Sequence, residues 1–169
     1  MVVKAGKFRA LFTVMFIGFF MASCLAGCQS LGQRNMGRLV PDFYRVAIPN
    51  NGETASETFQ TQDMTFKYQC WRAGNQMKIW GSGNIRFESI DELTFHLYFL
   101  DDRGEVISIK NFFSFLDNSD FVDFSAADRQ VHRDFTIPAG AVAFAIGYDG
   151  NTGRVPGAFD ISFSHYPFD

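Results

Sequence analysis

Three histidines are the side chains best suited to metal or acid–base chemistry in this chain. They are His96, His132 and His165. They lie far apart in the sequence, each near the end of the chain or at a polar position of an apparent strand. Structural and catalytic metal sites are usually recognised in a sequence by closely spaced ligands. We therefore expect three ordinary surface histidines and no metal site at these positions.

A second group with potential chemistry is an acidic cluster, Asp117, Asp120 and Asp123, interleaved with Asn118 and Ser119. Oxygen ligands of this kind suit calcium. However, the Asp-x-Asn-x-Asp-Gly pattern of a calcium loop is missing. A solvated loop is the favoured interpretation, and a calcium site is the weaker alternative.

Recognisable catalytic motifs do not occur in the sequence. Gly81-Ser82-Gly83 lacks the outer glycines of Gly-x-Ser-x-Gly and falls inside a predicted strand. Neither a phosphate-binding loop nor His-Glu-x-x-His is present. We therefore expect a protein that is not an enzyme, with no catalytic residues and no cofactor. A hydrolase that assembles a carboxylate pair by folding is the least favoured alternative.

The most specific pattern is Leu25-Ala26-Gly27-Cys28, which closes an apolar segment with a basic start. Lys4, Lys7 and Arg9 precede the apolar run 10–22. That run is too short to span a bilayer comfortably, and small residues follow it. Residues 1–27 are therefore predicted to be a signal peptide.

This arrangement resembles the signal peptides of bacterial lipoproteins. The resemblance implies cleavage before Cys28, a diacylglycerol attached to its thiol, and acylation of the new amino terminus. Gln29 and Ser30 follow in place of the Asp that favours inner-membrane retention, which implies the outer membrane and a periplasm-facing domain. The alternative is an ordinary signal peptide followed by a chance cysteine. Residues 28–41 are predicted to be the lipidated terminus and a tether, because their composition is polar and glycine-containing.

Charge and cysteine content narrow the possible partners. Removal of the leader takes away three basic and no acidic residues, which changes the net charge from -3 to -6. An acidic domain does not favour nucleic acid or anionic head groups, so membrane attachment is expected to come from the lipid on Cys28. Cys70 is then the remaining thiol, and we favour a buried, inert cysteine over a reactive one.

The rest of the chain, 42–169, is predicted to be a single all-β domain. Its apolar residues recur with period two and not 3.6, which is typical of half-buried strands. In 93–100 Leu93, Phe95, Leu97 and Phe99 form one apolar row. In 142–148 Val142, Phe144, Ile146 and Tyr148 form another, and this strand is expected to be central and covered on both faces. Strands are predicted at 43–48, 64–71, 77–87, 93–100, 105–116, 130–137, 142–148 and 159–166. A polar segment without a predicted strand covers 49–62, and loops are predicted at 117–128 and 149–157.

Seven to nine short strands of this kind favour an antiparallel two-sheet β-sandwich. The stretch 77–108 includes Leu97-Tyr98-Phe99-Leu100-Asp101-Asp102-Arg103-Gly104-Glu105-Val106, a strand, an Asp/Gly turn and a second strand. It resembles the immunoglobulin-like domains of exported bacterial lipoproteins, including the FxLyD type. The resemblance covers about a fifth of the chain and implies a fold class, but no active site.

A candidate binding face follows if 77–87 and 93–100 form a hairpin. Pairing Phe87 with Leu93 would place Trp80, Tyr98 and His96 together, on the face opposite the apolar row. Exposed aromatic residues with a polar rim suit a protein or a sugar. The alternative is that a second sheet or a loop covers these side chains.

The sequence thus favours a membrane-anchored accessory protein of the cell envelope that acts by binding another envelope protein. The second hypothesis is a module that binds peptidoglycan or another glycan through Trp80 and Tyr98. Neither hypothesis involves nucleic acid.

Overall fold

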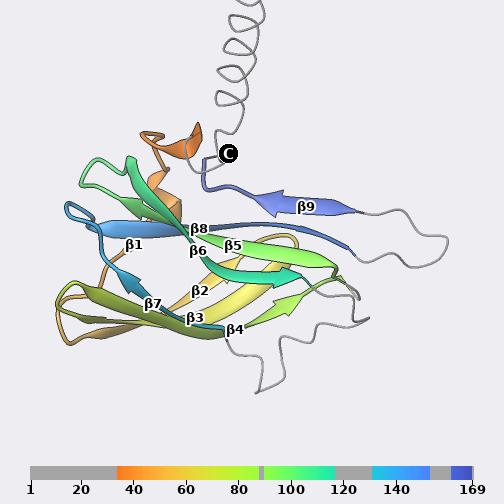
Figure 1. The fold of residues 1–169 in the computed structure, drawn as a ribbon, viewed down its shortest axis with the longest axis horizontal. Helices are drawn as coiled ribbons and strands as arrows, with labels where there is room; N and C mark the ends of the chain where they lie inside the picture. Colours follow the sequence, from red (N-terminus) through yellow and green to blue (C-terminus); the bar gives the residue numbers. More distant parts are fainter. Residues whose placement is uncertain (1–33, 88–89, 117–130, 153–160, 169) are drawn as a thin grey trace, which may run out of the picture. The chain divides into compact units, whose positions relative to one another are not determined.

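Two antiparallel sheets packed face to face form the described part of the protein (Figure 1). The computed structural model describes residues 34–87, 90–116, 131–152 and 161–168. The chain divides into two compact units, Met1–Asn35 and Met36–Asp169, and the sandwich belongs to the second. The predicted antiparallel β-sandwich is confirmed, with nine strands within the described residues.

The first sheet has the strand order β2-β3-β4-β7. Its strands are β2 (Thr54–Gln60), β3 (Met64–Ala73), β4 (Gln76–Ile85) and β7 (Val131–Thr136). The second sheet has the order β1-β8-β5-β6, and β9 also pairs with β8. Its strands are β1 (Val46–Ala47), β5 (Glu92–Leu100), β6 (Val106–Leu116), β8 (Ala143–Asn151) and β9 (Ser162–His165), and the 3-10 turn η1 (Asp42–Tyr44) precedes β1.

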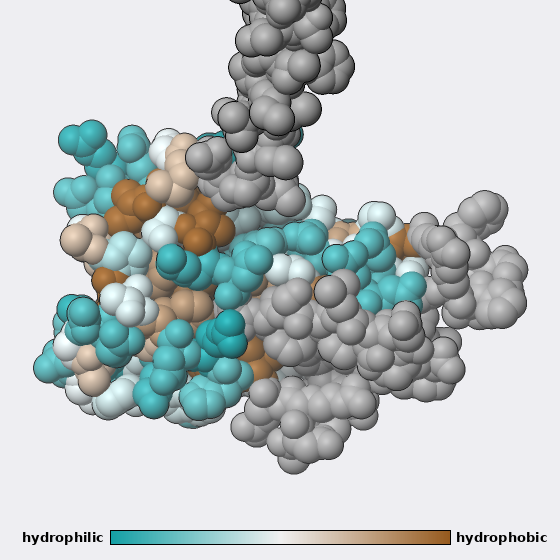
Figure 2. All heavy atoms as spheres, in the orientation of Figure 1, coloured by the Kyte–Doolittle hydropathy of each residue, from teal (hydrophilic) through white to brown (hydrophobic). Residues whose placement is uncertain are grey.

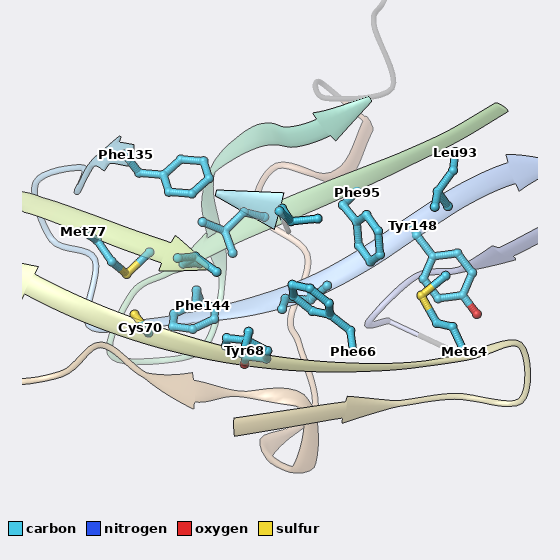
Figure 3. Close-up of a cluster of buried hydrophobic side chains, with 14 of the residues drawn as sticks. Met64, Phe66, Tyr68, Cys70, Met77, Leu93, Phe95, Phe135, Phe144 and Tyr148 are labelled. Atoms are coloured by element: carbon cyan, nitrogen blue, oxygen red, sulfur yellow. The ribbon is translucent and has the colours of Figure 1, made fainter. Parts of the chain in front are cut away.

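The core lies between the two sheets and is rich in aromatic rings (Figure 3). Alternate residues of β3, Phe66, Tyr68 and Cys70, are buried, as period two requires. Phe66 meets Phe95 of β5 with ring centroids 5.4 Å apart. Burial of one such side chain contributes about 1.5–3 kcal/mol, so this aromatic layer contributes substantially to stability.

Cys70 is completely buried in this core and forms no disulfide. Burial raises the pKa of its thiol to about 12. Because the thiolate is the reactive form, a neutral buried thiol is inert. The predicted burial of Cys70 is confirmed.

The turn between β5 and β6 forms where the Asp/Gly pattern predicts it. The Asp101 carboxylate accepts hydrogen bonds from the backbone N–H groups of Arg103 (3.0 Å) and Glu105 (2.8 Å). Gly104 adopts φ +86°, a conformation that glycine reaches without strain. The hairpin fixes the register of β5 against β6.

The hairpin predicted between 77–87 and 93–100 is wrong. β4 pairs with β3 and β7, whereas β5 pairs with β6 and β8. The chain instead crosses from the first sheet to the second between β4 and β5, where Ile90 is buried in the core. Ile79 of β4 and Leu97 of β5 therefore face the same core from opposite layers. An apolar row shows that a strand faces the core but not in which sheet it lies, so the hairpin could not be decided from alternation.

β2 lies within the polar segment 49–62, where no strand is predicted. Thr54–Gln60 pairs with β3 along its whole length. It is an edge strand with mostly exposed residues, and Phe59 is its one large apolar side chain packed against the core. The sequence therefore lacks the alternation by which strands are recognised.

The folded unit begins earlier than the predicted start at residue 42. Gly37 donates a backbone hydrogen bond to Val106 (2.8 Å), and Val40 donates one to Gly104 (2.9 Å). Val40 is fully buried. The last residues of the predicted tether, 37–41, are therefore part of the sandwich. The predicted strand 43–48 is shorter, since η1 occupies its beginning.

β8 is the central strand that the sequence predicts. It pairs with β5 on one side and with β1 and β9 on the other, and most of its residues are buried. Its bounds differ at both ends. Val142 precedes the strand and is exposed instead of facing the core, and the strand continues to Asn151 within the predicted loop 149–157.

Candidate binding face

The predicted cluster of Trp80, Tyr98 and His96 does not form as one face. Trp80 lies in the first sheet, opposite Gln69 and His132. Tyr98 and His96 lie together in the second sheet, with ring centroids 6.3 Å apart. Because the two sheets sandwich the core, their outer faces point away from each other.

Trp80 instead belongs to the outer face of the first sheet. Gln69 of β3 lies directly opposite Trp80. Trp71 is two residues further along β3 and is therefore the diagonal neighbour of Trp80. Both indoles are half-buried, and they are the two tryptophans of the chain. We call this surface the tryptophan face, and its residues are Ser56, Lys67, Gln69, Trp71, Lys78, Trp80, Ser82 and His132.

A shallow hollow of about 470 Å³ opens on this face beside Trp80. It is lined by residues of β2, β3 and β4, whose outward side chains include hydroxyls, an amide and an ammonium. They are Ser56, Glu57, Thr58, Lys67, Tyr68, Gln69, Trp80, Gly81 and Ser82. An apolar ring bordered by several hydrogen-bonding groups is the composition expected of a site for a polar ligand.

Gly81 allows the strands beneath the hollow to approach closely. A Cβ atom on Gly81 would lie 2.4 Å from the Lys67 carbonyl oxygen and 2.6 Å from the Cβ of Tyr68. Both neighbours are part of the facing strand β3 and have little room to move. Glycine here therefore helps hold β4, and with it Trp80, against β3.

Charges border the tryptophan face on the β7 side. Lys78 lies 3.4 Å from Asp134, and His132 lies 3.5 Å from the same carboxylate. These pairs are exposed and contribute little to stability. They give the rim of the face both a positive and a negative group.

Sequence analysis missed Trp71 and Gln69, although the signal was present. In β3 the buried residues Phe66, Tyr68 and Cys70 alternate with Lys67, Gln69 and Trp71. The parity alone places Trp71 on the polar side of its strand. The sequence did not show that Trp80 is a neighbour of Trp71, because the pairing of β3 with β4 was not predicted.

Tyr98 is on an outer face too, but it is 1% exposed. It belongs to a second apolar cluster whose other buried members are Val40, Leu100, Val106 and Ala145. The Phe168 ring packs edge-on against Tyr98 with centroids 5.3 Å apart, and the Arg38 guanidinium lies 4.2 Å from the centre of the Phe168 ring. The alternative that Tyr98 is covered is correct, since segments from both ends of the sandwich domain cover it.

His96 sits beside this cluster, with both ring nitrogens engaged. Nδ1 lies 2.9 Å from the Asn111 side-chain oxygen, and Nε2 contacts the Asp149 carboxylate. Burial lowers the pKa of His96, but the hydrogen bonds to Asp149 and Asn111 and the charge of Asp149 outweigh it, so the pKa lies above its ordinary value. A doubly protonated imidazolium satisfies both acceptors. This arrangement orients the ring and favours its protonated form, and it uses the nitrogens that acid–base catalysis would need.

The other two histidines lie elsewhere. His132 is exposed on the tryptophan face, and the His165 ring packs among Tyr44 (5.0 Å), Phe59 (5.5 Å) and Tyr148 (6.0 Å) between centroids. Three different environments therefore surround the three histidines. No group of three metal-binding side chains occurs within the described residues.

A polar contact between the sheets was also missed. The Tyr148 hydroxyl donates to the Asp63 carboxylate (2.8 Å) and contacts the Thr61 hydroxyl (2.7 Å). Tyr148 belongs to β8, whereas Thr61 and Asp63 lie in the turn between β2 and β3. Burial raises the pKa of Tyr148, so the phenol stays neutral. This contact joins the two sheets, and alternation predicts only that Tyr148 faces inward.

Two predicted sites lie outside the described residues. They are the lipidation site Cys28 and the calcium candidates Asp117, Asp120 and Asp123. In the part of the chain that is described, no helix has the length and apolar character needed to cross a membrane.

Comparison of the chain with protein-family models, with curated proteins and with solved structures finds no match. The tryptophan face therefore has to be interpreted from its own geometry.

Proposed function

We propose that this protein is a non-enzymatic accessory protein of the cell envelope, anchored by lipid on Cys28, and that it works by binding through the tryptophan face. The observation that carries the proposal is the position of Trp71 and Trp80 as diagonal neighbours on one broad, polar sheet face. Half-exposed indoles in such a setting lose little by gaining a partner and bury a large area when they do.

The anchor is proposed from the sequence pattern 25–28. A lipid anchor suits an acidic domain, because acyl chains hold a protein at a membrane without a basic patch. A Cys28→Ala variant should leave the membrane fraction and become soluble. Membrane association that persists in this variant would contradict the lipid anchor.

A glycan is the ligand class that the hollow supports best. Gln69, Lys67 and Ser82 offer an amide, an ammonium and a hydroxyl next to the indole of Trp80. A sugar ring presents an apolar face for stacking and hydroxyls at its edge, so this combination matches both parts of it. Peptidoglycan fragments are the first candidates for a periplasm-facing domain.

Intrinsic fluorescence tests this ligand class directly, because both tryptophans of the chain lie on the tryptophan face. We expect a saturable emission shift on titration with purified muropeptides. Gln69→Ala removes one hydrogen-bonding group and should weaken binding roughly 2- to 10-fold, the contribution of one such bond. Asn84→Ala is the matched control, since Asn84 is an exposed amide on β4 that does not line the hollow. Absence of any shift across the muropeptides would contradict a glycan ligand.

A protein partner is the second candidate, and the position of β2 favours it. Within the described residues β2 pairs only with β3, so its other edge is free to accept a strand beside the hollow. Capture from crosslinked envelopes, repeated with Trp80→Ala, tests this. One stoichiometric protein that is lost in the variant would support a protein partner, and equal recovery with both forms would contradict contact through Trp80.

A further inference from the structure

Four of the five exposed large apolar side chains of the described residues lie at one end of the sandwich. We call this the apolar end, formed by Met36 (47% exposed), Leu39 (60%), Phe43 (76%) and Val142 (52%). The fifth, Ile161 (51%), lies at the opposite end. Single exposed apolar residues are normal on protein surfaces, but their concentration at one end is not explained by chance exposure alone.

Backbone contacts place these residues together. Leu39 bridges to Glu105 in the turn between β5 and β6. Val142 donates a backbone hydrogen bond to Leu100, the last residue of β5 (2.9 Å). Met36 adjoins Gly37, whose N–H binds the first residue of β6. Phe43 lies in η1, between Val40, which binds Gly104, and β1, which pairs with the start of β8. Its ring packs on Tyr44 at 4.2 Å between centroids, so it borders this end on the outer side of the second sheet.

Ile161 marks the far end. Its carbonyl oxygen accepts a hydrogen bond from Thr152, which directly follows β8 (2.9 Å). β8 has nine residues, so about 30 Å separates the two ends. Figure 1 shows the turn between β5 and β6 and the start of β8 at the left end of the sandwich, and Figure 2 shows brown and tan surface at the upper left in the same orientation.

The apolar end is also the end nearest to the proposed anchor along the chain. Met36 follows Cys28 by eight residues, which span at most about 29 Å even when fully extended. A lipid on Cys28 therefore keeps Met36 within that distance of the bilayer surface. Leu39 and Phe43 follow within seven residues of Met36.

We infer that the apolar end inserts into the interface of the bilayer that holds the lipid anchor. The inference rests on the proposed lipidation of Cys28. Phe, Leu and Met side chains gain by burial at the boundary between head groups and acyl chains. Arg45 forms an ion pair with Asp42 (2.8 Å), and Arg103 is flanked in sequence by Asp101, Asp102 and Glu105, so burial and not net charge drives the contact. The tryptophan face is a broad face of the sandwich and remains open in this orientation.

Spin labelling of the lipidated full-length protein tests the inference. The protein is reconstituted into vesicles of phosphatidylethanolamine and phosphatidylglycerol, with a nitroxide on Phe43→Cys or on the control Ile161→Cys. Both positions are exposed and Cys70 is buried, so labelling is selective and leaves the fold intact. We expect the label at 43 to be accessible to oxygen but protected from a water-soluble nickel complex, and the label at 161 to be accessible to nickel.

Each other result overturns the inference in a distinguishable way. If the protein floats with the vesicles but the label at 43 is accessible to nickel, the lipid anchor is supported and the insertion of the apolar end is contradicted. Protection of position 43 from both oxygen and nickel means that protein, and not lipid, covers the patch. Failure to float overturns the anchor itself and the docking with it.

Discussion

The outer faces of the two sheets both carry aromatic side chains, but these are covered on one sheet and partly exposed on the other. On the second sheet Tyr98 is covered by the segments that precede β1 and follow β9. On the first sheet Trp71 and Trp80 stay half-exposed among polar neighbours. The difference teaches that an aromatic residue at an outward position is a packing residue where the end segments of the domain pack over it. It is a binding candidate where the described residues leave it partly exposed.

Truncation of the covered aromatic residue should have the largest effect on stability. We expect Tyr98→Ala to lower the free energy of unfolding by about 3–5 kcal/mol, because it leaves a cavity under Val40 and Phe168. Urea denaturation followed by circular dichroism measures this loss. A loss below about 1 kcal/mol would mean that the terminal segments do not pack on the second sheet in solution.

The next largest effect should come from the strand contact beneath the tryptophan face. Gly81→Ala forces a Cβ atom against the Lys67 carbonyl and Tyr68. Overpacking of this kind typically costs about 1–3 kcal/mol. Gly140→Ala is informative beside it, since Gly140 has open space around it but φ +85°, so its effect reports backbone strain alone. Equal thermal shifts in the two variants would argue against a packing role for Gly81.

The sequence predicts those features of the two faces that depend on contacts between residues close in the chain. The turn at Asp101 and Gly104 and the inward row of β5 are local in sequence, and both are confirmed. The assignment of β4 and β5 to different sheets is not local. Alternation shows which side of a strand is apolar but not which strand lies beside it.

The same limit explains the candidate site. Parity correctly puts Trp80 and Tyr98 on outward sides, yet the partner of each depends on strand order. β2 was missed because Ala55 and Glu57 occupy its inward positions together with only one large apolar residue, Phe59. The cover over Tyr98 comes from chain segments more than 50 positions away, which no periodicity records.

The third prediction concerns Trp80 on the tryptophan face. Its truncation should have a small effect on stability and a large effect on ligand binding. Trp80→Ala should cost about 1 kcal/mol or less, because half-exposed residues leave no sealed cavity. The variant should retain the native circular dichroism spectrum and lose the ligand-dependent emission shift of the remaining Trp71. Unfolding of Trp80→Ala would show that Trp80 is a packing residue and would remove the contrast between the faces.

The smallest effect concerns His96, where the cover over the second sheet ends. Its pKa is raised in the folded protein, so the folded state binds its proton more tightly than the unfolded state. The resulting stability is fully present below pH 6.5 and is lost as the pH rises through the folded pKa. For a partly exposed pair we expect a decline of about 0.2–1 kcal/mol.

Asp149→Asn tests this effect because it removes the charge and leaves a side chain of the same shape next to His96. Burial then acts on the pKa of His96 with less opposition, so the decline above pH 6.5 should flatten or reverse. Asp134→Asn, at the exposed pairs on the tryptophan face, should leave the decline in place. Urea denaturation at several pH values measures all three proteins. An unchanged decline in Asp149→Asn would mean that His96 is not held by Asp149.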